Sequence, residues 1–346
     1  MRKTAILFLT LILSLFALNG GAVVRASEIS ANEYTYALRG SILTVHNPIP
    51  HTIRSALEKH SEIRTIHLLG ELPSPEDLME LMEERPDVTF HWSFDVLGVQ
   101  TSTTAEALDL SGIPMDSTDA IEAVLPRFYG LKKVIMCGCG LTNEEMDALN
   151  RRYPDTEFVW TVKISGFRLR TDAKFLMPFL YGYKLYDHDL SALKYCTQLE
   201  CIDFGHMKIS NCAVLENMPN LRYLIIADTA VSDLTPLGTL NKLEFLEVFL
   251  TSATDLGPLI NCSSLKDLNI SWTPVQDFTP LLHMSQLDRL WMGGCYTSAA
   301  VRRDLSSALP NTAIVFHSNA STNKGWRFAP NYYRQRDILG MHYMFT

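Results

Sequence analysis

The sequence lacks the short motifs on which most catalytic and nucleic-acid-binding proteins depend. Its 346 residues contain no H-E-x-x-H metalloprotease motif, no phosphate-binding loop and no G-x-S-x-G nucleophile elbow. The ten histidines are scattered without the spacing of metal ligands. The net charge is −8, without a block of basic residues, whereas a nucleic-acid partner requires a basic face. These absences predict a protein that is not an enzyme, binds no nucleic acid and needs no cofactor or metal.

Only one long apolar run is present, over residues 5–18, directly after two basic residues. Small residues follow, and the segment 24–26 (VRA) fits a small-x-Ala cleavage site. Residues 1–26 are therefore predicted to be a signal peptide. This implies a secreted or extracellular protein, and one alternative is that it stays associated with the cell surface. The alternative is an uncleaved anchor, because the apolar stretch could reach about the 20 residues that a bilayer requires. No membrane span is expected after cleavage.

A 22-residue repeat dominates the second half of the chain. Four apolar columns keep this spacing: Leu199, Leu221, Leu243, Leu265 and Leu287; Ile202, Leu224, Leu246, Leu268 and Leu290; Phe204, Ile226, Val248, Ile270 and Met292; and Ile209, Val231, Ala253 and Val275. One turn of such a repeat cannot bury its own leucines, so stability must come from stacking on neighbouring turns.

The segment 221–237 closely follows the pattern L-x-x-L-x-L-x-x-N-x-I-x-D-I-x-P-L. It resembles the leucine-rich-repeat family, in particular the exported bacterial type with internalin-like repeats of this same length. The resemblance implies an α/β solenoid in which L-x-L strands form a curved parallel sheet and Asp-x-x-Pro-Leu turns begin partly helical returns.

The asparagine position of the family pattern is replaced throughout this chain. Its residues here are Met207, Thr229, Thr251, Thr273 and Cys295. A threonine hydroxyl can take over part of the hydrogen bonding of the asparagine, whereas Met207 is expected not to.

The N-terminal half has a longer, 68-residue repeat. Ile66 matches Val134, Gly70 matches Gly138, and Pro86 matches Pro154. Helices are expected over residues 78–85 and 146–153, each preceded by N-cap residues, and small hairpins at Gly98 and Gly166. This pattern predicts irregular, helical leucine-rich-repeat-like turns over residues 27–186 and regular repeats over residues 187–297, forming one continuous solenoid.

Residues 298–346 are predicted to form a C-terminal cap and a tail rich in aromatic and basic residues. Seven positions from Leu290 to Phe316 match seven positions from Val134 to Trp160, which indicates a helix-plus-strand unit over the last open edge. The tail from residue 325 onward has too many apolar residues for a free end, so we expect it to fold back over the final turn or along the sheet. The alternative is a segment that attaches the protein to a surface.

Binding is expected on the side chains that lie between the inward leucines of each strand, on the concave face. The candidate ligand-binding residues are Tyr223, Phe245, Glu247, Phe249, Asn269, Trp272, Arg289 and Trp291. Exposed aromatic residues in this number usually mark an interaction site. A protein or peptide ligand is the first hypothesis, and a carbohydrate or cell-wall polymer that stacks on the rings is the second. The alternative is that the tail or neighbouring side chains cover these rings.

Seven cysteines remain after the predicted cleavage point, and an odd number cannot all pair within one chain. Cys196, Cys201, Cys212, Cys262 and Cys295 occupy recurring repeat positions, where buried free thiols are ordinary packing. Cys137 and Cys139 form a C-x-C pair, which is too little for a metal site.

Overall fold

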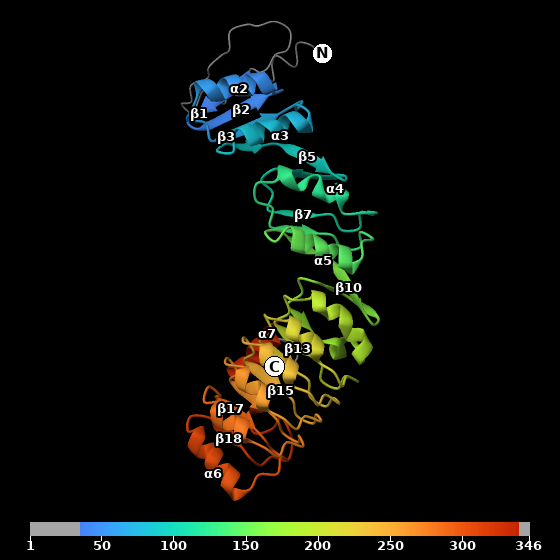
Figure 1. Cartoon of the computed structure of the whole chain (residues 1–346), viewed down its shortest axis with the longest axis vertical. Coiled ribbons are helices and arrows are strands. Elements are labelled where there is room, and N and C mark those ends of the chain that lie inside the picture. Colours follow the sequence, from blue (N-terminus) through green and yellow to red (C-terminus); the bar gives the residue numbers. More distant parts are fainter. Residues whose placement is uncertain (1–34, 339–346) are drawn as a thin grey trace. The chain divides into compact units, whose positions relative to one another are not determined.

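The computed structural model describes residues 35–338, so the predicted signal peptide lies outside the described part of the chain (Figure 1). Within these residues the chain divides into two compact units, 35–141 with 148–158 and 142–147 with 159–338. Helix α5 (Asn143–Arg152) and strand β9 (Glu157–Val159) contain the boundary between the units. None of the helices in residues 35–338 is long and apolar enough to cross a membrane.

The N-terminal unit begins with a four-stranded sheet covered by two helices. Strands β1 (Thr35–Arg39) and β2 (Ile42–His46) are antiparallel, and β3 (Thr65–Leu69) and β4 (Thr89–His91) continue in parallel. Helices α2 (Pro50–Lys59) and α3 (Pro75–Glu84) connect the parallel strands. Both begin with proline in the first turn, where its missing N–H has no helical partner to lose.

A hairpin and a second sheet complete this unit. Strands β5 (Ser93–Val96) and β6 (Val99–Ser102) pair antiparallel. Strands β7 (Ala107–Asp109), β8 (Lys133–Ile135) and β9 form a sheet of three, with α4 (Asp119–Glu122) and η1 (Leu125–Arg127) between β7 and β8. Two expectations are confirmed here: the hairpin turns at Gly98, and the helices α3 and α5 end before Pro86 and Pro154.

The C-terminal unit contains a parallel sheet of seven strands in sequential order. Its strands are β12 (Phe175–Leu176), β13 (Cys201–Asp203), β14 (Tyr223–Ile225), β15 (Phe245–Glu247), β16 (Asp267–Asn269), β17 (Arg289–Trp291) and β18 (Ala313–Val315). An antiparallel hairpin, β10 (Thr161–Ile164) with β11 (Phe167–Arg170), precedes them and turns at Gly166 as predicted.

The returns between these strands are mostly short 3-10 helices. They are η2 (Pro178–Tyr181), η3 (Asp187–Tyr195), η4 (Ala213–Asn217), η5 (Thr235–Thr239), η6 (Gly257–Asn261) and η7 (Thr279–His283); α6 (Ala299–Ala308) replaces them before β18. η8 (Trp326–Phe328) and α7 (Pro330–Ile338) follow β18. In η5, η6 and η7 an aspartate two residues upstream accepts a backbone N–H and proline fixes φ, which starts the turn.

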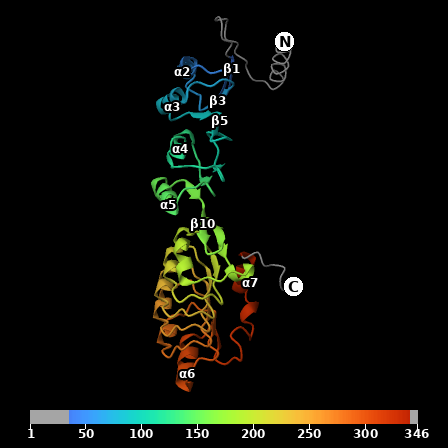
Figure 2. The ribbon, with the colours of Figure 1, turned by 90° about the vertical axis from the view of Figure 1, so that its right-hand side faces the viewer.

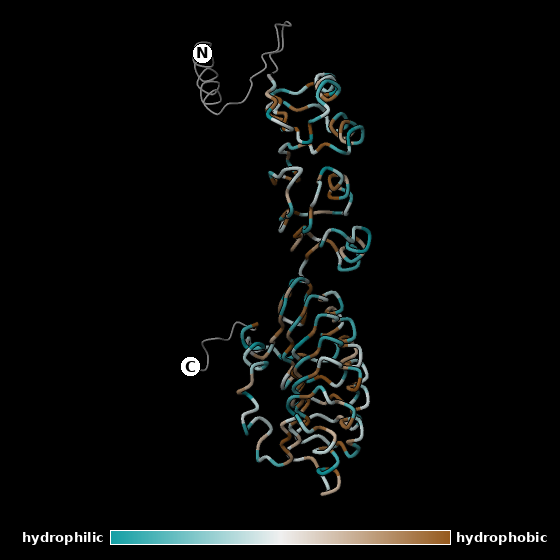
Figure 3. The backbone as a smooth tube through the Cα atoms, turned by 90° about the vertical axis from the view of Figure 1, so that its left-hand side faces the viewer, coloured by the Kyte–Doolittle hydropathy of each residue, from teal (hydrophilic) through white to brown (hydrophobic). Residues whose placement is uncertain are grey.

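Strand pairing follows the 22-residue repeat. Leu224 faces Leu246, Leu246 faces Leu268, and Leu268 faces Leu290, so the central leucines of β14 to β17 lie in one column. All four side chains are fully buried. Figure 3 shows hydrophobic (brown) and hydrophilic (teal) stretches along the turns of this array. The register confirms the predicted stacking of the 22-residue repeats.

The residues at the asparagine position bond in three different ways. The hydroxyls of Thr229, Thr251 and Thr273 each donate to the carbonyl three residues earlier in the same turn, at 2.7 Å. The Cys295 thiol reaches the preceding repeat, at Ile270 O. The expectation for Met207 is wrong in part, because its Sδ accepts the N–H of Leu185 at 3.3 Å.

The strands of residues 35–338 do not form one uninterrupted sheet. Strands β1–β4, β7–β9 and β12–β18 belong to three separate sheets. Two antiparallel hairpins, β5–β6 and β10–β11, lie in the chain between these sheets, and each forms a separate two-stranded sheet.

Replacing Leu246 by alanine tests the register. Leu246 is fully buried between two leucine neighbours, so Leu246→Ala should lower the free energy of unfolding by about 2–5 kcal/mol. Leu250→Ala is the matched control, because Leu250 lies in the same repeat and is 47% exposed. Chemical denaturation followed by circular dichroism measures both. Equal losses in the two variants would contradict the register.

Candidate functional site

The strand face is the surface formed by the flanking residues of five neighbouring strands. Its members are Cys201 and Asp203, Tyr223 and Ile225, Phe245 and Glu247, Asp267 and Asn269, and Arg289 and Trp291. Residues 321–338, here named the tail segment, lie across this face. Figure 2 shows α7 on the strand side of the repeats, away from the 3-10 returns.

Aromatic packing holds the tail segment in place. Trp326 is fully buried, with ring centroids 5.2 Å from Phe245 and 5.3 Å from Trp291. Tyr332 packs 6.3 Å from Phe245. These residues belong to one apolar cluster, which confirms that the tail folds back along the sheet.

Most of the predicted binding residues are therefore covered and not exposed. Tyr223, Phe245, Glu247, Phe249, Asn269 and Trp291 are buried, Arg289 is half-buried, and only Trp272 is exposed, at 44%. The predicted exposure of this face is wrong, because the rings pair with Trp326 and Tyr332 of the same chain. The alternative, in which the tail covers the rings, is the arrangement in the structure.

Buried charge accompanies these rings. Burial raises the pKa of Glu247 to about 7, although Arg327, the Trp326 indole and Arg289 oppose the shift. The indole Nε1–H of Trp326 donates to Glu247 Oε1 at 2.6 Å. Burial also raises the pKa of Asp203, on the same face.

Arg289 connects the face to the tail segment. Its Nε donates to Asp267 Oδ1 at 2.5 Å, and its Nη1 donates to the carbonyl of Trp326 at 2.7 Å. The guanidinium also lies 4.4 Å from the centroid of the Trp326 ring, within cation–π range. One side chain thus binds a carboxylate, a backbone carbonyl and an aromatic ring.

A second surface remains open at the ends of the strands. We name it the exit edge: two exposed columns, His206, Asp228, Leu250, Trp272 and Gly294, and Lys208, Ala230, Ser252, Pro274 and Tyr296. The columns flank the buried asparagine-position residues. Neighbouring members should lie about 4.8 Å apart, because each column crosses adjacent strands.

The first column of the exit edge has a left-handed backbone. His206, Asp228, Leu250 and Trp272 have φ between 54° and 64°, and Gly294 has a φ of 79°. The conformation costs a non-glycine residue roughly 1–2 kcal/mol. The N–H of Leu250 donates to Ser271 O at 3.0 Å and that of Trp272 to Gly293 O at 2.8 Å, so the ladder between repeats holds the strained residues.

Trp272 lies against Gly294 of the next repeat. A Cβ at Gly294 would meet the Trp272 ring at 2.4 Å, so only glycine leaves room for the indole in this position. Tyr296 follows two residues later and is 89% exposed. The C-terminal half of the exit edge therefore presents two large rings in a defined backbone setting.

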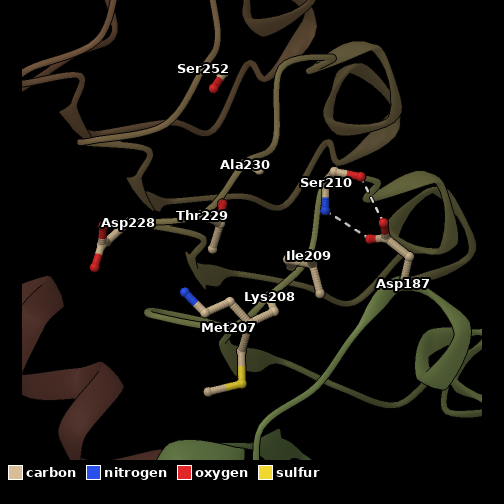
Figure 4. Close-up of a pocket in the computed structure, with 9 residues that line it drawn as sticks. All are labelled: Asp187, Met207, Lys208, Ile209, Ser210, Asp228, Thr229, Ala230 and Ser252. Atoms are coloured by element: carbon tan, nitrogen blue, oxygen red, sulfur yellow. Dashed lines mark hydrogen bonds between the residues drawn. The ribbon is translucent and has the colours of Figure 1, made fainter.

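A pocket of about 420 Å³ lies at the other end of the exit edge (Figure 4). Lys208 and the small side chains of Ala230 and Ser252, all from the second column, line it. Asp187 lines it and accepts the N–H and hydroxyl of Ser210 at 2.7 and 2.6 Å. His206 Nδ1 lies 2.7 Å from Asp228 Oδ2 nearby.

The second column of the exit edge was missed by the sequence analysis. Its signal was available, because residues 208, 230, 252, 274 and 296 keep the 22-residue step and include the large ring of Tyr296. The residues described by the structure contain no group of three or more His, Cys, Asp or Glu side chains that could hold a metal.

Comparison with known proteins gives distant likenesses. No family model and none of the curated proteins match the sequence. Among solved structures, an internalin from Listeria monocytogenes is 13% identical, with 81% of each chain covered and a TM-score of 0.35. Internalin C2 from the same organism is 19% identical over 72% of this chain and 79% of that one, with a TM-score of 0.29.

A leucine-rich-repeat protein from Leptospira interrogans is 13% identical, over 74% of this chain and 72% of that one, with a TM-score of 0.35. The repeat architecture of this chain rests on its own strand register.

The buried Glu247 makes stability depend on pH. Its pKa is about 7 in the folded protein and near 4.5 when exposed, so unfolding releases a proton between these values. Stability should fall as pH rises from about 4.5 to 7, by about 3 kcal/mol in total. Glu247→Gln keeps an acceptor for Trp326 and should flatten this part of the profile. Asp203→Asn should change the profile in the same direction.

Asp277→Asn provides the contrast. Hydrogen bonds from Thr279 lower the pKa of Asp277. The Asp277→Asn variant should therefore be less stable than the wild type at high pH and equally stable at low pH. Melting temperatures measured from pH 2 to pH 8 separate the cases, because the contribution of Asp277 is lost only below its ordinary pKa of 3.8. A Glu247→Gln profile as steep as that of the wild type would show that Glu247 is not the group that titrates.

Proposed function

We propose that this chain is a secreted protein-interaction module that binds a protein partner along the exit edge of its 22-residue repeats. The observation that carries the proposal is the pair of exposed columns, whose C-terminal half contains the large side chains of Trp272, Pro274 and Tyr296. Secretion rests on the basic and apolar N-terminal sequence alone.

Three features support the exit edge as a binding surface. Large aromatic side chains are the usual anchors of protein interfaces, and Phe179, 58% exposed and 5.6 Å from the His206 ring, adds another beside the first column. The backbone beneath the first column is held by hydrogen bonds between repeats, so little order is lost on binding. Polar and charged side chains at His206, Lys208 and Asp228 complement the apolar end with polar contacts.

The chemistry of the surface favours an extended segment of a protein as the ligand. A continuous row of contacts along the columns suits an extended chain, which presents a side chain about every 3.3 Å along its length. Its apolar side chains would meet Trp272 and Tyr296, while the pocket over Ala230 and Ser252 would take a smaller polar group.

The experiment is a peptide-display selection on the purified protein, followed by titration of the selected peptides. The variant with Trp272→Ala and Tyr296→Ala should bind them at least tenfold more weakly, since truncation of an interface anchor costs about 2 kcal/mol or more. Its melting temperature should change little, because Tyr296 is 89% exposed and Trp272 is 44% exposed.

Ile260→Ala is the matched control, because Ile260 is 41% exposed on η6, away from the exit edge. Equal binding by the control, the double variant and the wild type would refute the exit edge as the site. Selection of no peptide, together with glycan-array binding lost in the double variant, would support carbohydrate recognition in place of protein recognition.

A further inference from the structure

We infer that the strand face is a second binding groove, for a peptide segment with tryptophan next to a basic residue, and that the tail segment occupies it as an internal competitor. The inference concerns a different surface from the exit edge and does not depend on it. It gives the covered residues Tyr223, Phe245, Glu247, Asn269, Arg289 and Trp291 a role as a ligand site that opens when the tail segment leaves.

The strand face holds the tail segment by its main chain. Asn269 Nδ2 donates to the carbonyl of Ser321 at 2.7 Å, and Trp291 Nε1 donates to that of Asn323 at 3.0 Å. Arg289 Nη1 donates to the carbonyl of Trp326. The donors come from two neighbouring strands, and every peptide offers such acceptors. These bonds to backbone carbonyls would therefore form with a peptide of any sequence.

The side chain of Trp326 makes the sequence-specific contacts of the tail segment. The Trp326 ring packs on Phe245 and Trp291, its Nε1–H donates to Glu247 Oε1, and the guanidinium of Arg289 covers it. Four side chains from two strands thus surround a single indole. A smaller side chain would leave the carboxylate of Glu247 buried without its donor.

Charge favours a basic residue beside the tryptophan. The strand face contains the carboxylates of Asp203, Glu247 and Asp267, with Arg289 as its one described cation. Arg327 follows Trp326 directly and favours the ionised forms of both Asp203 and Glu247. A ligand with arginine or lysine in this position would reproduce that interaction.

The fit of the tail segment is incomplete. Glu247 Oε2, Ser271 Oγ and Arg289 Nη2 are buried, and the described residues offer them no hydrogen-bond partner. Unpaired buried polar atoms are costly, so a ligand that satisfied them would bind better than the tail segment. The strands pair with one another and not with the tail segment, so its departure would leave the ladder intact.

The test uses the full chain with a protease site inserted between Asn319 and Ala320, both of which are exposed. The protein is folded first and cut afterwards. A fluorescent synthetic peptide of residues 321–338 is then titrated into cut and uncut protein. The peptide should bind the cut protein at least tenfold more tightly, because the tethered segment competes at an effective concentration of about millimolar.

Two peptides define the groove. A peptide with Trp326→Ala should bind the cut protein at least tenfold more weakly than the natural one, whereas one with Tyr333→Ala should bind equally, because Tyr333 is 52% exposed. Binding of the two variants with equal affinity would refute the tryptophan site. Failure of the natural peptide to bind, or unfolding of the cut protein, would show that the tail segment is a fixed part of the core and would overturn the inference.

The double variant Trp272→Ala with Tyr296→Ala separates the two proposals. Cut protein that carries it should bind the peptide as the wild type does, because neither residue belongs to the strand face. Loss of peptide binding in this variant would place the peptide on the exit edge and overturn the inference. A display-selected peptide that binds the exit edge in both cut and uncut protein would support the proposed function, whatever the result for the strand face.

Discussion

The alignment of leucines between neighbouring repeats is the constraint on which the C-terminal unit depends. Strands β13 to β17 have three residues each, too few to be stable alone. Each central residue is buried between the equivalent apolar residues of the preceding and the following strand, as Leu246 is between Leu224 and Leu268. The same register sets every other column of the repeat. The strand face and the exit edge are therefore two consequences of one periodic packing.

These two surfaces differ in their exposure to solvent, because they carry different kinds of side chains. The strand face carries large rings in adjacent positions together with carboxylates, and the tail segment removes both from water. Removal of apolar surface from water is favourable, whereas burial of Glu247 is not, as the raised pKa of its carboxyl shows. The exit edge has its buried threonines between two open columns, so its rings stay accessible without cost to the core.

In the N-terminal unit the segments that connect the parallel strands β2, β3 and β4 are longer. Helices α2 and α3 have ten residues each, where the C-terminal unit has 3-10 turns of about five. The hairpins β5–β6 and β10–β11 pair within themselves and interrupt the parallel ladder. Irregular spacing in the sequence thus corresponds to separate sheets and not to one long one.

The sequence by itself determined the repeat, its register, the inward columns and the returns, because each depends on residues a fixed distance apart along the chain. The same periodicity identified which side chains share a face, including Phe245, Glu247 and Trp291. Only the tertiary structure decided that this face is covered. Trp326 meets Glu247 across 79 residues and outside any repeat, so no periodic pattern records the contact. Exposure is a property of what packs against a surface, and for this face that partner is a segment whose position the repeats do not set.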